Sequence, residues 1–229
     1  MTRESQTRSK DDLRQLYSRE MAHRLKNLLA RVTGLVVATL RNAPSTETAA
    51  DKVRDRLHAM GRVYDILGAC AWRAVPLGDL VARELNQYGQ HRLRLEGTQI
   101  LLTPEAGLAT AMIVHELGTN ARQHGALATE HGTVKVGWSD DAGTLVIDWR
   151  ERGTRINDAA PKKGFGISLI EGLVRHELEG TSTFTFAPDG ARCRIAIAGR
   201  HMLSDDTTEA EAEAEIDRAR HASAGLHRA

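Results

Sequence analysis

Glu116 and Asn120 are the residues of this chain whose types and spacing point most directly to chemistry. They lie four apart in the segment 115–127, HELGTNARQHGAL, which has the apolar spacing of a helix, so both side chains project from one face. A carboxylate beside a carboxamide suits a hydrated Mg²⁺ carried on phosphates, because Mg²⁺ prefers oxygen ligands and retains several waters. The pair therefore predicts a site for a phosphate compound with magnesium.

A glycine-rich turn, Gly164-Phe165-Gly166, precedes a predicted helix over 166–178. Such turns at helix N-termini offer backbone N–H groups to phosphate oxygens. Gly-x-Gly before a helix is common, so this pattern indicates a phosphate site only together with the polar segment 152–163 before it.

His23 lies on a predicted helix, about 160° around the helix axis from Leu25 at ~100° per residue, so it points away from the apolar stripe. A neutral imidazole nitrogen is a usable nucleophile near pH 7. An ordinary exposed histidine is the alternative, since the chain has 10 of them.

Four motifs in order carry a family resemblance. They are HRLKNLL at 23–29, HELGTNARQHGAL at 115–127, WRERG at 149–153 and GFGISLI at 164–170. Together they resemble histidine kinases of the HWE type, whose ATP-binding domain has the GHKL fold, over roughly residues 15–198. The resemblance implies a protein-histidine kinase that uses ATP and Mg²⁺ and passes the phosphoryl group to an aspartate of a response-regulator receiver domain.

The same resemblance implies a role for each matching residue. His23 is the phosphoacceptor, Glu116 orients a water or the metal, and Asn120 contacts Mg²⁺ and the phosphates. Glu151 accepts from the exocyclic amine of adenine, and Gly153 lets the chain pass close to the base. The other cofactor-binding residues that it implies are His115, His124, Lys163, Gly164 and Gly166, with the segment 152–163 as the lid over ATP.

Two departures leave an alternative open. Gln123 stands where the family usually has Lys, and Thr154 where it usually has Gly. A histidine phosphotransfer protein with a degenerate ATPase-like domain that binds no nucleotide would share His23 and the hairpin. A GHKL-type ATPase or serine kinase is a third interpretation, but it leaves the hairpin with His23 unexplained.

Two long amphipathic helices, over 11–41 and 47–71, are predicted on either side of Pro44. Joined by so short a loop they form an antiparallel hairpin. The apolar surface left over favours a four-helix bundle in a homodimer, or packing against the chain's own catalytic domain.

From residue 75 onward the pattern alternates between helices and strands. We expect helices within 76–88 and over 104–124 and 166–178, and strand hairpins formed by 91–96 with 98–102, 133–139 with 144–150, and 182–187 with 191–198. The predicted fold class is α+β: a helical hairpin followed by an α/β sandwich, with helices on one face of a mixed, mostly antiparallel sheet. The expected domains are 1–74 for dimerisation and phosphotransfer, 75–200 for ATP binding, and 201–229 as an acidic tail.

Composition narrows the class of protein further. The chain has 229 residues, 41% of them hydrophobic, and a net charge of +1, which gives no electrostatic case for binding nucleic acid. Its two cysteines have no metal-site spacing and favour a reducing compartment. There is neither a signal-peptide core nor an apolar run near the ~18 residues of a membrane span. We therefore expect a soluble, cytoplasmic protein without membrane association. Too few residues precede the first helix for a sensor domain, so we expect the input from a partner such as a separate sensor protein, from the tail, or not at all.

Overall fold

The computed structural model describes residues 26–41, 43, 45–70, 73–154 and 164–203. The chain forms two compact units, residues 1–57 and 58–229, and the boundary between them falls inside helix α2 (Thr46–Ala69). The phosphoacceptor candidate His23, the lid residue Lys163 and the acidic tail lie outside the described residues. The functional domain boundary at residues 74 and 75 stays a prediction.

In the first unit, a helix over residues 26–41 is followed by the start of α2. Ser45 caps α2, because its Oγ accepts the N–H of Thr48 at 3.2 Å. Near the loop, Arg56 Nη1 donates to Thr39 Oγ1 at 2.8 Å, and Thr39 donates to the carbonyl of Leu35 at 2.6 Å. The bond from Arg56 to Thr39 joins two successive helices, as the predicted hairpin requires.

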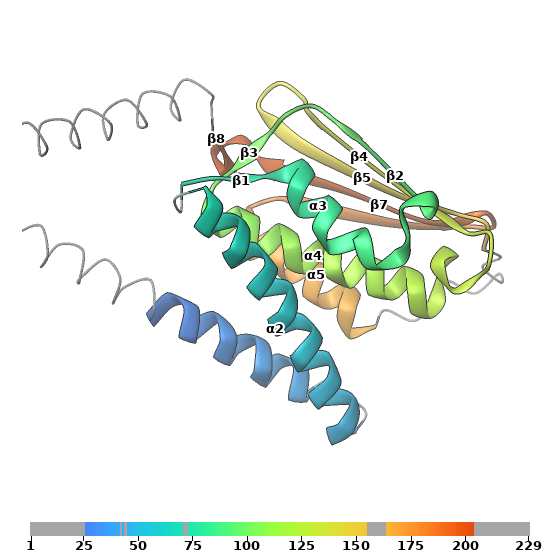
Figure 1. Ribbon diagram of the computed structural model, residues 1–229, viewed down its shortest axis with the longest axis horizontal. Helices are drawn as coiled ribbons and strands as arrows, with labels where there is room; N and C mark the ends of the chain where they lie inside the picture. Colours follow the sequence, from blue (N-terminus) through green and yellow to red (C-terminus); the bar gives the residue numbers. More distant parts are fainter. Residues whose placement is uncertain (1–25, 42, 44, 71–72, 155–163, 204–229) are drawn as a thin grey trace, which may run out of the picture. The chain divides into compact units, whose positions relative to one another are not determined.

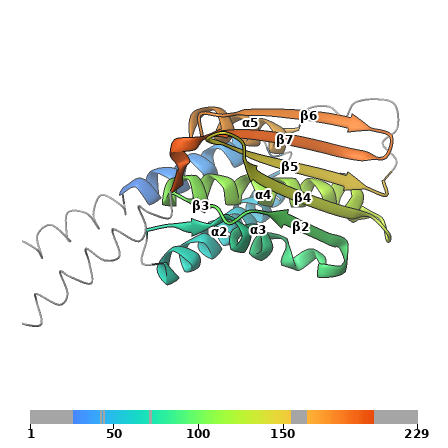
Figure 2. The same cartoon turned by 90° about the horizontal axis from the view of Figure 1, so that it is seen from above.

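The second unit contains a five-stranded sheet with helices on one face (Figure 1). In spatial order the strands are β2 (Leu93–Gly97), β4 (Thr133–Asp140), β5 (Thr144–Arg152), β7 (Gly190–Ala198) and β6 (Thr181–Ala187). β2 runs parallel to β4, and every other neighbouring pair is antiparallel (Figure 2). The covering helices are α3 (Leu77–Leu85), α4 (Pro104–His124) and α5 (Phe165–His176). The predicted α+β class and the hairpins of β4 with β5 and β6 with β7 are confirmed.

The predicted hairpin of 91–96 with 98–102 is wrong. β2 pairs with β4, whereas β3 (Leu101–Leu102) joins a separate small sheet between β1 (Val75–Pro76) and β8 (Met202–Leu203). The predicted strands left only Gly97 as a loop, and the tightest common hairpins need two loop residues. The indole of Trp138 packs against this segment instead. A Cβ on Gly97 would lie 2.3 Å from the indole, and Trp138 Nε1 donates to the carbonyl of Thr98 at 2.8 Å.

The core lies between the sheet and the helices. Large side chains that are almost completely buried there include Leu80, Ile113, Trp149, Ile170 and Ile195. Cys193 on β7 is buried, and burial, with a smaller effect of Asp148, raises the pKa of its thiol to about 12. Cys70 is half-buried against the same core. Within the described ranges, no helix is long and apolar enough to cross a membrane.

Candidate functional site

Helix α4 supplies most of the candidate site. Its start follows from the sequence: Thr103 Oγ1 accepts the N–H of Ala106 at 3.3 Å, and Pro104 occupies the first turn, where a missing N–H costs nothing. Along the polar row in its second half, Glu116 is buried, Asn120 is half-buried and Gln123 is exposed. This row is therefore not an ordinary solvated face, because a carboxylate at 5% exposure is withdrawn from water.

Gly166, in the first turn of α5, lies against that row. A Cβ on Gly166 would be 3.0 Å from Glu116 Oε2, 3.2 Å from Asn120 Oδ1 and 3.4 Å from Asn120 Nδ2. The fold thus brings together three residues that the sequence separates by up to 50 positions. The group offers a carboxylate, a carboxamide and a backbone that can be approached closely.

The N-terminus of α5 adds anion-binding capacity to this group. Gly164 is the N-cap residue and, being glycine, has no side chain of its own to cap the helix. The first backbone N–H groups of a helix have no partner inside it, and the helix dipole favours negative charge at this end. Gly164 itself is exposed, so phosphate oxygens can reach this end of α5.

Glu151, at the end of β5, lies beside the C-terminal end of α4. Its Oε2 accepts the N–H of Ala126 at 2.7 Å, and its Oε1 accepts the indole N–H of Trp149 at 3.1 Å. Burial raises the pKa of Glu151, and the two hydrogen bonds oppose that rise. A Cβ on Gly125 would lie 2.0 Å from Oε2 and 2.9 Å from Ala121 Cα, so a side chain there would displace the Glu151 carboxylate. Each carboxylate oxygen keeps a further lone pair for a ligand.

Gly153 follows directly and has φ of +87°, a conformation that favours glycine. A Cβ there would also lie 2.9 Å from Gly132 Cα. Thr129 Oγ1 lies 3.0 Å from the Gly153 carbonyl oxygen, which it can reach as a donor. The chain after β5 is thus held tightly against the loop that follows α4.

Arg92 is a residue of this region that the sequence did not reveal. Its guanidinium donates to four backbone carbonyls of the loop after α4: those of Ala126 at 3.1 Å, Leu127 at 3.3 Å, Thr129 at 2.5 Å and Gly132 at 2.9 Å. These partners lie 34–40 residues away along the chain, and no local pattern signals such a contact. Because Ala126 in turn donates to Glu151, Arg92 supports that carboxylate indirectly.

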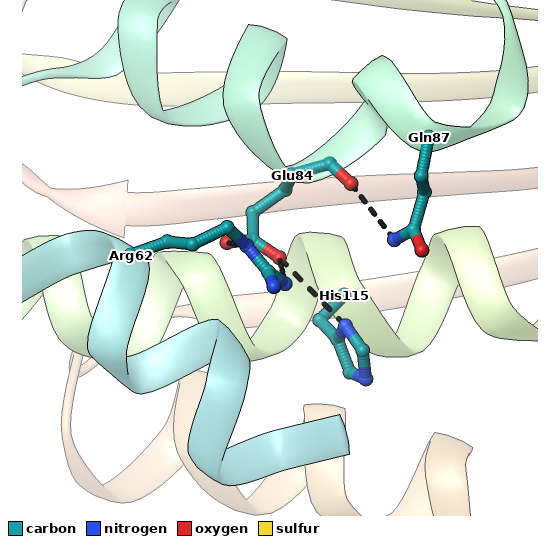
Figure 3. Close-up of polar contacts among 4 residues, drawn as sticks. All are labelled: Arg62, Glu84, Gln87 and His115. Atoms are coloured by element: carbon teal, nitrogen blue, oxygen red, sulfur yellow. Dashed lines mark hydrogen bonds and ion pairs between the residues drawn. The ribbon is translucent and has the colours of Figure 1, made fainter.

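His115 lies about 100° around α4 from Glu116 at ~100° per residue, and it contacts a different helix. Its ring lies near the carboxylate of Glu84 on α3, which Arg62 of α2 binds (Figure 3). His124 is exposed in the last turn of α4. The structure therefore groups Glu116, Asn120 and Gly166, sets Glu151 and Gly153 at the far end of α4, and places His115 apart from both groups.

Residues 20–99 match the HWE histidine kinase family. The chain contains an HWE histidine kinase region. Its sequence is 30% identical over 182 residues to a blue-light-activated histidine kinase of Brucella anthropi and 31% identical over 183 residues to that of Brucella ovis. Both alignments cover 76% of this chain but 37% of the relative, so the chain spans little more than a third of these curated relatives.

The fold of the chain is also similar to that of solved structures. The blue-light-activated histidine kinase EL346 of Erythrobacter litoralis matches with a TM-score of 0.62 at 18% identity, over 77% of this chain and 59% of that one. Its separate histidine kinase domain matches with a TM-score of 0.55 at 17% identity, over 75% of this chain and 95% of the domain. These likenesses support the α+β architecture.

Proposed function

We propose that this protein is an ATP-dependent protein-histidine kinase that phosphorylates its own His23. The observation that carries the proposal is the group of Glu116, Asn120 and Gly166 beside the N-terminus of α5. That arrangement suits a polyphosphate, and its position in a chain with an HWE kinase region makes ATP the expected nucleotide.

The residues present fit Mg²⁺ carried by ATP. Among the described residues there is no cluster of three or more His, Cys, Asp or Glu side chains that would hold a metal ion by itself. Asn120 supplies an oxygen ligand and Glu116 a carboxylate that orients it or a bound water, while phosphates and water complete the ligand set. When bound, Mg²⁺ supplies neutralisation of phosphate charge.

Glu151 fits the adenine end of the same nucleotide. It lies beside Gly125, five residues after Asn120 and therefore about 7.5 Å further along the helix axis. A buried carboxylate there accepts from the exocyclic amine of adenine, whereas the guanine carbonyl would set an acceptor against an acceptor. Lys163 and the polar segment 152–163 complete the proposed site as a lid. His124 is a further residue that we propose to bind the nucleotide.

The proposed reaction is a phosphoryl transfer to nitrogen. The bond between the γ-phosphorus and its bridging oxygen breaks, ADP leaves with the electron pair, and a P–N bond forms on the imidazole of His23, which loses its proton. The second step moves the phosphoryl group to an aspartate of a response-regulator receiver domain, as in two-component signalling. A carboxylate acceptor suits this step because the phosphoramidate is a reactive donor.

A homodimer through the hairpin is part of the proposal. The described helix over 26–41 leaves three large apolar side chains exposed: Leu29 at 56%, Val37 at 39% and Leu40 at 53%. They lie within about 80° of each other around the helix at ~100° per residue. An apolar stripe of this kind favours burial against a second copy in a four-helix bundle.

A histidine phosphotransfer protein is the second candidate. Exposed Gln123 supplies no cation at the polar row, and both oxygens of Glu151 already accept one hydrogen bond. Titration with a fluorescent ATP analogue, with and without Mg²⁺, separates the two candidates. A kinase binds the analogue and binds it more tightly with Mg²⁺, whereas a degenerate domain shows no saturable signal.

The direct test is labelling with ATP that carries a radioactive γ-phosphate. We expect wild-type protein to label in the presence of Mg²⁺, with a bond that is labile in acid and stable in alkali, as a phosphoramidate is. His23→Ala should not label, whereas His91→Ala, which removes an exposed histidine of the second unit, should label normally. Wild-type labelling of His23→Ala would show that the assignment is wrong.

A further inference from the structure

Glu84 is an ionisable side chain of α3 that lies almost completely inside the second unit, with 1% of its side chain exposed. Arg62 of α2 binds it with two parallel hydrogen bonds, Nε to Oε1 at 2.8 Å and Nη2 to Oε2 at 2.5 Å. The backbone carbonyl of Glu84 accepts from the side chain of Gln87 at 3.2 Å, and Gln87 lies in the short 3-10 helix Asn86–Tyr88 that follows α3 (Figure 3). The bidentate geometry fixes the carboxylate plane.

His115 of α4 approaches the same carboxylate from the other side. Its Nδ1 lies 3.7 Å from Glu84 Oε2, and its side chain is 8% exposed. This nitrogen is buried without a hydrogen-bond partner within the described part of the chain. The separation exceeds a hydrogen bond, but a shift of less than ~1 Å would close it. Burying a nitrogen without a hydrogen-bond partner is unfavourable, so its position beside a buried carboxylate calls for an explanation.

We propose that Glu84 is a positioning residue of the kinase reaction: held by Arg62, it accepts from His115 Nδ1 and so sets the orientation of α4 that aligns Glu116 and Asn120. The inference rests on the proposed kinase function. His115 and Glu116 are consecutive residues of one helix, so a rotation of α4 that changes the first contact changes the second.

Stability alone does not account for this cluster. Buried ion pairs are often no more stabilising than apolar side chains of the same volume, because both charges must leave water. The cluster instead joins one residue from each of three helices, α2, α3 and α4. Arg62 also lies on the helix that continues from the predicted phosphotransfer hairpin, so the contact ties that helix to the one that carries the proposed metal-binding amide.

The test uses full-length Glu84→Gln, which keeps the volume and an acceptor but removes the charge. We expect its autophosphorylation rate at saturating Mg-ATP to fall about tenfold or more, which corresponds to the loss of one hydrogen bond to a charged group. The dissociation constant for a fluorescent ATP analogue should change less than about threefold, since Glu84 is not placed at the nucleotide. Glu105→Gln, an exposed acid in the first turn of α4, is the matched control and should leave both values unchanged.

Two further variants separate positioning from simple loss of structure. Arg62→Lys keeps a cation beside Glu84 and should retain a larger part of the rate than Arg62→Met. The double variant Arg62→Met with Glu84→Gln should be no slower than the slower single variant, because residues that act as one unit are not additive. A normal rate in Glu84→Gln, or a loss confined to nucleotide affinity, would overturn the inference.

The nitrogen NMR signals of the His115 imidazole give a readout that needs no catalysis. They are assigned by their disappearance in His115→Gln. Glu84→Gln should shift the Nδ1 signal, and Glu105→Gln should not. An unchanged chemical shift of the Nδ1 signal in Glu84→Gln would overturn the inference even in an active kinase. Absence of labelling in the wild-type protein would instead overturn the proposed function, and the inference with it.

Discussion

The carboxylate of Glu116 closes the space beside Gly166: a Cβ on that glycine would lie 3.0 Å from Oε2. The residues come from α4 and α5, two helices that pack on the same face of the sheet (Figure 1). Because Asn120 Oδ1 would be almost as close, at 3.2 Å, a side chain at this glycine displaces the two groups that we assign to the metal and the phosphates.

Gly166→Ala should therefore weaken catalysis without unfolding the protein. A shift of a few tenths of an ångström to about 1 Å in Glu116 or Asn120 is expected to lower the labelling rate ~10-fold or more. Gly172→Ala on the same helix is the matched control, since no atom lies within 4 Å of its Cβ position. That change should leave labelling intact and raise the stability of the helix by up to about 1 kcal/mol. Equal labelling rates for the two variants would contradict the assigned role of Gly166.

Asn120→Ala should reduce labelling to below about 1% of wild type, because phosphoryl transfer depends on the positioned metal. The side chain is half-buried, so thermal unfolding should show a change within about 1 kcal/mol. Gln123→Ala, an exposed polar residue one turn later, serves as the control and should label normally. Substantial labelling by the Asn120 variant would remove this residue from the metal site.

Glu151→Ala should weaken ATP binding and narrow the preference for ATP over GTP, as competition titrations would show. The pH dependence carries a second expectation. Burial raises the pKa of Glu151, so as the pH falls this carboxylate gains its proton earlier than an ordinary glutamate does. ATP affinity should accordingly decline on acidification, and Glu151→Gln should lack that part of the decline. A pH profile identical in both proteins would argue against the adenine role.

The same shift has a consequence for stability. A pKa raised in the folded state means that the folded protein binds this proton more tightly than the unfolded chain does. The contribution of this tighter proton binding to the free energy of unfolding is therefore fully present below the pKa of Glu151 in the unfolded chain. It is lost as the pH rises through the raised pKa of the folded state. Denaturant titrations of wild type and Glu151→Gln across this window should differ in slope against pH.

Arg92→Met should destabilise the second unit by about 2–4 kcal/mol, because four backbone carbonyls each lose a charged donor. Nucleotide affinity should fall as well, since the loop carries the Ala126 N–H that holds Glu151. Arg94→Met, an exposed arginine two residues along β2, is the control. Denaturant unfolding measures the stability and nucleotide titration the affinity. Equal stability of the two variants would show that the four hydrogen bonds of Arg92 are dispensable.

Transfer to a receiver domain should slow as salt rises. The predicted first helix is basic around His23, with Arg14, Arg19, Arg24, Lys26 and Arg31, and receivers present an acidic pocket. Screening shortens the Debye length from ~10 Å at 0.1 M to ~3 Å at 1 M. Segment 204–217 carries seven acidic residues and no Lys or Arg, so it can compete for the same basic surface. Deleting 204–229 should speed transfer at low salt only; an unchanged rate there would exclude the tail from the mechanism.

Local sequence signals predicted the elements that carry their own start and stop residues. Thr103 and Pro104 set the beginning of α4, and the turn at 140–143 joins β4 to β5, as expected. The strand pairing of 93–102 was mispredicted because pairing depends on distant partners. Leu93 pairs with Val134, and Leu101 with Leu203, and neither partner is near in sequence.

By itself the sequence determined the kind of elements and their order. It also determined that the side chains of Glu116 and Asn120 share one helix face, because helical spacing follows from local backbone geometry. Only the tertiary structure decided what that row faces. Gly166 comes from another helix, Arg92 reaches a loop about 35 residues away, and Glu84 lies between Arg62 and His115. Such contacts depend on how buried surfaces of separate elements pack together, which periodicity along one element does not encode.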